Sequence, residues 1–276
     1  MTTRIMLALV AIGLLAGAAP AAAIIINHTN YDPSTIPQET MNQVGQLKLY
    51  FAHASVGGNI IDGLSDLHSL NATRYQLHTV TEDGVPPATT SPGNMYEYMR
   101  GNPGWSAKVT TFETYMANGW GANKVHVAIN KFCYIDPDAN FTSYRNSMVN
   151  LEATPAYAAT RFVYMTIPLM TAPNSASDHY LRQTFNAQLR QFCAANDKIL
   201  LDIADIEAWN PSGVEQTITY NGTVCQVMAP EYTSDGGHLN TLGRDHVAMG
   251  LYAMLAKGPF IIAHLKMHKA EGNFTW

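Results

Sequence analysis

The fold is decided by the segment LKLYFAHASVGGNIIDGL, which covers residues 47–64. Its first part, Leu47 to His53, is an apolar run of strand length, and Ile60 to Leu64 begins a helical run. Between them lies Ala54-Ser55-Val56-Gly57-Gly58-Asn59, whose two glycines suit a tight turn. The segment therefore places a serine where a strand passes into a helix, and at such junctions an α/β sheet presents its functional groups.

The rest of the chain repeats this alternation of strand-like and helix-like segments, which predicts a single α/β domain with a mainly parallel, five-stranded sheet. The expected strands are Leu47–His53, Tyr75–Val80, Val125–Asn130, Arg161–Ile167 and Ile199–Ile203. The expected helices cover residues 58–70, 105–118, 140–151, 177–196 and 241–256. Residues 24–45 read as an irregular lead-in. Residues 81–104 and 204–234 read as long loops, of the kind that form the walls or lids of a site.

A second informative block, Thr233-Ser234-Asp235-Gly236-Gly237-His238, precedes the last expected helix. A serine hydroxyl is a poor nucleophile until a base takes its proton, and the base needs a carboxylate to orient it. The glycine pair lets the chain turn sharply, so Asp235 can reach Nδ1 of His238. This pattern predicts Ser55 as nucleophile, His238 as base and Asp235 as the orienting carboxylate, without a cofactor or a metal.

Each of these residues also has a simpler interpretation. Ser55 suits a helix N-cap, and Asp235 suits the start of a helix. His238 and His246 could form half of a metal site, but the sequence supplies no third ligand in a recognisable metal-binding motif. The pairing of the two distant blocks favours catalysis.

In this pairing the chain resembles the SGNH/GDSL hydrolase superfamily, whose serine lies in the first block and whose last block reads D-x-x-H. The resemblance implies a three-layer α/β/α, flavodoxin-like fold and acyl-ester hydrolysis through a serine. The chain departs from the family because its first block is H-A-S-V-G in place of G-D-S, and because it has no G-x-N-D. It is therefore similar to a divergent branch, and the substrates of better-known members are not carried over.

Three groups are expected to bind the developing oxyanion. The backbone N–H of Ser55 lies at a helix N-terminus, which suits an anion. The resemblance implies Asn130 as the second donor, with the adjacent Lys131 as an alternative and a structural strand-end role also open. Gly101 is preferred to Gly84 as the glycine donor.

Several other residues have weaker interpretations. His53 lies two residues before Ser55, so it either tunes the pocket or is a structural histidine. Aromatic residues at positions 96, 98, 105, 120 and 209 either line a sugar or acyl site or belong to the core. Among them Tyr96 and Trp209 are preferred as site residues because they lie in the expected loops.

The N-terminus predicts export. Residues 1–23 read as a signal peptide with Arg4 at its start, an apolar stretch from Ile5 to Leu15 and alanines at 21–23. This leaves residues 24–276 as one hydrolase domain, secreted or periplasmic, with no stable membrane span after cleavage. An uncleaved N-terminal anchor is the alternative.

Composition limits the function classes. With 47% hydrophobic residues over its full length, the chain can fill one core. A net charge of −5 argues against a nucleic-acid partner, because phosphate binding needs clustered cations. Three cysteines, Cys133, Cys193 and Cys225, are too few for a disulfide framework, although two of them could pair.

The sequence thus predicts an exported serine esterase that removes O-acyl groups, such as acetate, from glycans or small esters. A lipase-like esterase is the alternative of the same class. A non-catalytic carbohydrate-binding protein is the alternative of a different class, because the G-D-S and G-x-N-D signatures are missing.

Overall fold

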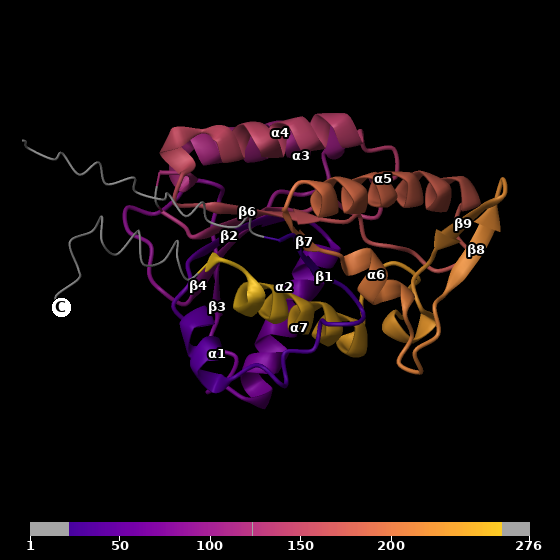
Figure 1. Cartoon of the computed structure of the whole chain (residues 1–276), viewed down its shortest axis with the longest axis horizontal. Coiled ribbons are helices and arrows are strands. Elements are labelled where there is room, and N and C mark those ends of the chain that lie inside the picture. Colours follow the sequence, from indigo (N-terminus) through magenta and orange to yellow (C-terminus); the bar gives the residue numbers. More distant parts are fainter. Residues whose placement is uncertain (1–21, 123, 261–276) are drawn as a thin grey trace, which may run out of the picture.

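A central sheet of seven parallel strands organises the computed structural model, which describes residues 22–122 and 124–260. The strand order is β1-β7-β6-β5-β2-β4-β3 (Figure 1). The strands are β1 Ile24–Ile26, β2 Leu49–His53, β3 His78–Thr81, β4 Asn94–Met99, β5 Val127–Asn130, β6 Arg161–Met165 and β7 Ile199–Leu201. A separate antiparallel hairpin joins β8 Thr217–Tyr220 to β9 Thr223–Gln226.

Helices cover both faces of the sheet (Figure 1). One layer comprises α1 Gln38–Val44, α2 Val56–Leu70, α6 Ile203–Ala208 and α7 Thr241–Lys257. The other comprises α3 Trp105–Tyr115, extended by a π-helical turn at Met116–Trp120, together with α4 Phe141–Ala153 and α5 Ala176–Ala195. Short 3-10 turns lie at Pro155–Tyr157 and Pro230–Tyr232. The predicted three-layer α/β/α architecture is confirmed.

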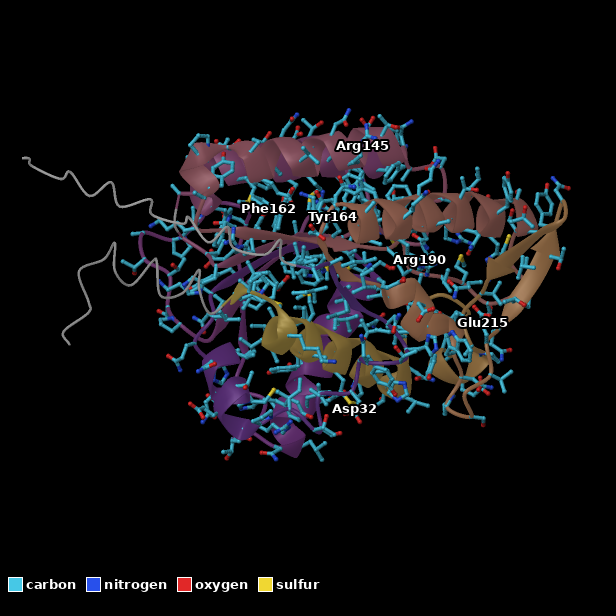
Figure 2. The ribbon with its side chains drawn as sticks, in the orientation of Figure 1. Asp32, Arg145, Phe162, Tyr164, Arg190 and Glu215 are labelled. Carbon is cyan, nitrogen blue, oxygen red and sulfur yellow. The ribbon has the colours of Figure 1, made fainter. Side chains whose placement is uncertain are left out.

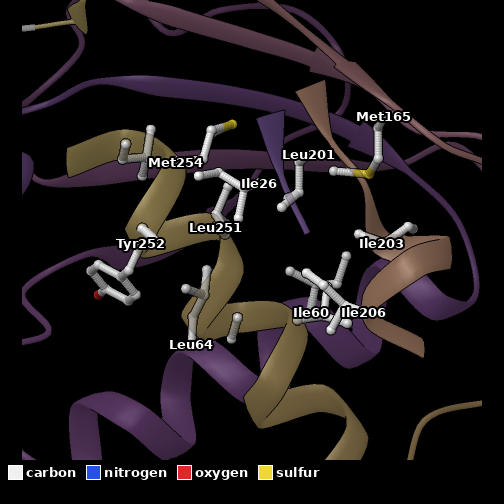
Figure 3. Packing of buried hydrophobic residues seen from close by; sticks show 14 of the residues in the cluster. Ile26, Ile60, Leu64, Met165, Leu201, Ile203, Ile206, Leu251, Tyr252 and Met254 are labelled. Atoms are coloured by element: carbon white, nitrogen blue, oxygen red, sulfur yellow. The ribbon is translucent and has the colours of Figure 1, made fainter. Parts of the chain in front are cut away.

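The two cores follow from the alternation of side chains along each strand. In β2, Leu49 and Phe51 join the cluster on the α2 and α7 side, whereas Tyr50 and Ala52 join the cluster on the α3 and α4 side. Figure 3 shows part of the first cluster, in which side chains of the sheet meet those of α2 and α7. Phe162 and Tyr164 of β6 belong to the second cluster (Figure 2). Burial on both faces explains why these strands are apolar throughout.

The predicted count of five strands is wrong, because the sheet also contains β1 and β4. β1 has only three residues and lies in the expected lead-in, which also contains α1. β4 reads NMYEYM and lies inside the expected loop 81–104. Its polar residues Asn94 and Glu97 interrupt the apolar pattern that is expected of an interior strand. The expected loop 204–234 likewise contains most of α6 and the β8–β9 hairpin.

The expected signal peptide, residues 1–23, lies outside the described residues except for its last two positions, so it stays a prediction. Within the described ranges, no helix combines the length and apolar character needed to cross a membrane.

Candidate active site

Ser55 occupies a strained turn between β2 and α2. Its φ of 50° and ψ of −115° lie in a region that non-glycine residues rarely adopt. Helix α2 begins at Val56, so only Ala54 and Ser55 connect it to β2. Backbone strain of this kind is concentrated at functional sites, and a sharp strand-to-helix turn is known to expose nucleophilic serines.

His238 lies directly beside this serine. The Oγ atom of Ser55 is 2.7 Å from Nε2 of His238, although the two residues are 183 positions apart. On the other side of the ring, Nδ1 of His238 is 2.7 Å from Oδ2 of Asp235. The serine, the imidazole and the carboxylate thus form a continuous hydrogen-bonded chain, with the geometry that a general base needs.

The loop that carries Asp235 is shaped by its own carboxylate. Oδ1 of Asp235 accepts hydrogen bonds from the backbone N–H groups of Gly237, at 2.9 Å, and of His238, at 2.7 Å. The pKa of Asp235 lies well below its usual range. The backbone N–H of His238 lowers it most, followed by the N–H of Gly237 and the His238 ring, because each of them stabilises the charged carboxylate. The side chains of His238 and Asp235 are 44% and 57% exposed, so the carboxylate is charged and faces solvent.

Two hydrogen bonds fix this loop to the rest of the molecule. Oδ1 of Asn59, in the first turn of α2, accepts a hydrogen bond of 3.1 Å from the backbone N–H of Leu239. The carbonyl of Gly236 accepts one of 3.0 Å from the N–H of Thr171. The helix that follows the serine and the loop that carries the histidine are therefore joined directly.

The three expected oxyanion donors come from three adjacent strands. β2 lies between β4 and β5, with His53 in register with Met99 and Ala52 in register with Asn130. Ser55, Gly101 and Asn130 therefore leave the sheet at the same edge. Gly101 is exposed and has a φ of 72°, and a Cβ added there would meet no other atom within 4 Å.

Asn130 and Lys131 differ in how their polar atoms are satisfied. Asn130 is 1% exposed, and within the described residues neither its Nδ2 nor its Oδ1 has a hydrogen-bond partner. Lys131 is also buried, but its Nζ donates to the carbonyl of Phe132 at 2.8 Å. Buried amides are normally paired, so Asn130 has hydrogen-bonding capacity left for another group.

Tyr134, which no sequence motif marks, also reaches the site. Its hydroxyl is 3.4 Å from Nε2 of His238, the same atom that lies 2.7 Å from Oγ of Ser55. Its ring stands nearly perpendicular to the imidazole, with centroids 5.4 Å apart. The sequence signal was weak, because Tyr134 lies in a loop four residues after Asn130 and matches no motif.

His53 belongs to a separate buried pair. Its Nε2 is 2.8 Å from Oε2 of Glu97 on β4, and Oε1 of Glu97 accepts a hydrogen bond from Thr81 on β3. Burial lowers the pKa of His53, and the bond to Glu97 opposes that shift. The ring stacks on Phe51 and lies against Gly57, so His53 packs against the turn that carries Ser55.

The preferred aromatic candidates separate in the structure. Tyr96 lies within β4 and is 3% exposed, so its prediction as a loop-borne site residue is wrong: it packs on the ring of Trp120. Trp209 stacks on His28 and lines a cavity of about 310 Å³ together with Tyr31, Tyr232 and His246. Trp105 and Tyr98 pack, half-buried, against the α3-side core.

His246 packs against two tyrosines, Tyr232 and Tyr31. Its Nδ1 is 3.0 Å from the hydroxyl of Tyr232, and its ring packs against Tyr31. Among the described residues there is no group of three or more His, Cys, Asp or Glu side chains that could hold a metal ion. Cys133, Cys193 and Cys225 are buried free thiols.

No family model matches the sequence, and no curated protein matches it. Among solved structures, the chain is similar to a protein from Bacteroides fragilis described as "a putative acylhydrolase". The two chains share 13% sequence identity with a TM-score of 0.46, and the alignment covers 79% of this chain and 93% of the other.

Proposed function

We propose that this protein is a serine ester hydrolase of SGNH type that uses Ser55, His238 and Asp235 as its catalytic triad. The observation that carries the proposal is the hydrogen-bonded chain from Oγ of Ser55 through both nitrogens of His238 to Asp235, with 2.7 Å at each link. A helix N-cap needs neither link, and the side chain of Ser55 makes no capping hydrogen bond to α2.

In the proposed reaction, Ser55 Oγ attacks the ester carbonyl carbon while its proton passes to Nε2 of His238. Asp235 holds the imidazole with Nδ1 protonated and stabilises the positive charge that forms. Collapse of the tetrahedral intermediate breaks the bond to the alcohol oxygen, which takes the proton from Nε2. Water then attacks the acyl-enzyme by the same route and releases the acid.

The negative charge on the carbonyl oxygen needs donors that are already in place. The backbone N–H of Ser55 is the first, because it lies at the start of α2. Asn130 is the second, and its buried amide, which has no hydrogen-bond partner within residues 22–122 and 124–260, supports this assignment. Gly101 is the third, since it follows the strand next to β2.

The proposed substrates are O-acyl groups, acetate above all, on glycans or small esters outside the cytoplasm. This part rests on the predicted signal peptide and on the exposed position of His238 and Asp235, which admits a large alcohol. A lipase-like esterase with a longer acyl group is the alternative within the same class.

Hydrolysis of p-nitrophenyl acetate and of an O-acetylated glycan tests the proposal. The wild type should hydrolyse both, and Ser55→Ala should lose at least about 10⁴-fold in kcat, as triad nucleophile variants do. Ser65→Ala, an exposed serine on α2, is the matched control and should keep full activity. Equal turnover by the wild type and Ser55→Ala would contradict the triad. Glycan binding without any turnover by the wild type would favour the non-catalytic alternative.

A further inference from the structure

The hydroxyl of Tyr134 lies on the side of the imidazole where proton transfer takes place. It is 3.4 Å from Nε2 of His238, the atom that takes the proton of Ser55, so it lies next to the acceptor of that transfer. Asp235 lies at the opposite nitrogen, Nδ1. Tyr134 therefore approaches the atoms that react and not the atoms that orient them.

The protein holds this side chain in place from two directions. The ring lies against Gly237, where an added Cβ would be 3.0 Å from Cζ of Tyr134. The backbone carbonyl of Tyr134 accepts a hydrogen bond of 2.8 Å from Arg182, a residue of α5 that is 1% exposed. A side chain fixed at both its backbone and its ring loses little freedom when it binds substrate.

The chemical state of the hydroxyl suits a hydrogen-bond donor. Burial raises the pKa of Tyr134 above the usual value of a tyrosine. The phenol therefore keeps its proton at neutral pH. Its contact with Nε2 of His238, at 3.4 Å, is at the long end for a hydrogen bond, so a closer oxygen can replace it.

That other oxygen is defined by the mechanism. The alcohol oxygen must hydrogen-bond Nε2 of His238 to receive its proton, so it enters the space around Nε2 that the Tyr134 hydroxyl already adjoins. As the carbon–oxygen bond breaks, negative charge develops on the leaving oxygen. The Tyr134 O–H can donate to this charge while the proton itself still comes from Nε2.

We propose that Tyr134 is a further catalytic residue, whose hydroxyl donates a hydrogen bond to the leaving-group oxygen during breakdown of the tetrahedral intermediate. This inference rests on the proposed function. It also specifies the substrate class, because such help matters for poor leaving groups, such as sugar or alkyl alcohols, and not for activated phenols.

Tyr134→Phe tests this role, since it keeps the ring on Gly237 and removes only the hydroxyl. The measurement is kcat/KM for acetate esters of p-nitrophenol, phenol and ethanol, an alcohol series of rising pKa. The variant should lose no more than about 3-fold on p-nitrophenyl acetate and about 10- to 100-fold on ethyl acetate, as expected for one hydrogen bond to a charged oxygen. Tyr180→Phe on α5 is the matched control and should behave as the wild type with every ester.

Two further readouts separate catalysis from folding. The melting temperature of Tyr134→Phe should match that of the wild type. Its rate of labelling by a fluorophosphonate, whose fluoride leaves without a proton, should stay within about 3-fold of the wild type. An equal loss on all three esters, a collapsed labelling rate, or no loss at all would overturn the inference while leaving the triad intact. A wild type that cleaves no ester would overturn the proposed function and this inference with it.

Discussion

Gly57 and His53 are packed so closely that position 57 has no room for a side chain. A Cβ at Gly57 would lie 2.4 Å from Cβ and 2.5 Å from Nδ1 of His53, in the turn that presents Ser55. His53 cannot withdraw, because it is fully buried and paired with Glu97. The serine turn is thus fixed by a contact between the end of β2 and the first turn of α2.

This contact predicts that Gly57→Ala is destabilising. Overpacking at a rigid site costs about 1–3 kcal/mol, which corresponds to a fall of several degrees in melting temperature for a domain of this size. Gly58→Ala is the matched control, because its Cβ would meet only the flexible end of Met99 at 3.4 Å. Thermal unfolding of both variants checks the prediction, and equal melting temperatures would show that the turn is not fixed by His53.

Asp235→Asn is expected to fold normally and to lose activity. The asparagine oxygen can still accept the N–H groups of Gly237 and His238, but its amide cannot hold Nδ1 of His238 in the protonated tautomer. We expect kcat to fall about 10²- to 10⁴-fold. Asp138→Asn, an exposed aspartate, serves as control. Retention of more than a tenth of the wild-type kcat by Asp235→Asn would remove Asp235 from the triad.

Asn130→Ala tests the assignment of the oxyanion donor. If its amide meets the developing charge, kcat should drop about 10²- to 10³-fold with little change in KM. A structural Asn130 gives the opposite pattern, a lower melting temperature with a nearly normal kcat. If Lys131→Ala loses kcat and Asn130→Ala does not, the pocket group is Lys131 and the assignment is wrong by one residue.

Glu207 predicts a pH dependence of stability. It is 1% exposed, and burial raises its pKa to about 8, although Lys131 and Arg182 act in the opposite direction. Because this pKa lies above the ordinary glutamate value of 4.5, the folded state binds more protons than the unfolded state between the two values. The contribution of Glu207 to stability is therefore present at low pH and is lost as the pH rises through that window.

Glu207→Gln removes this titration. The melting temperature of the variant relative to the wild type should therefore increase from pH 5 to pH 8. Glu39→Gln, on the surface of α1, should give a constant difference over the same range. Parallel curves for Glu207→Gln and the wild type would show that Glu207 is charged when buried.

Four of the five predicted strands have strong apolar contrast, and the fifth, β3, is largely exposed and begins three residues later than expected. β2, β5, β6 and β7 are buried on both faces, so their runs stand out, whereas β4 carries Glu97 because a buried histidine pairs with it. The short β1 gives no periodic signal at all. Hydrophobic pattern is a weaker signal for a strand where polar side chains replace apolar ones.

The residues of the candidate site also differ in how well the sequence predicts them. Ser55, Asp235 and His238 lie in glycine-containing turns with a recognisable order, and the structure brings all three together. Tyr134 and Asn59 reach the site through tertiary packing, since their partners are 104 and 180 positions away. Contacts of that range form only when distant strands and helices pack together, and no local pattern in the sequence encodes them.

The most direct test of the central claim is the mass of the intact protein after reaction with a fluorophosphonate, followed by peptide mapping. A single adduct per chain is expected, located on Ser55, and its formation should be abolished in His238→Ala and in Ser55→Ala but not in Ser65→Ala. An unlabelled wild type, or an adduct on any residue other than Ser55, would contradict the claim that the bond between Ser55 and His238 activates a nucleophile.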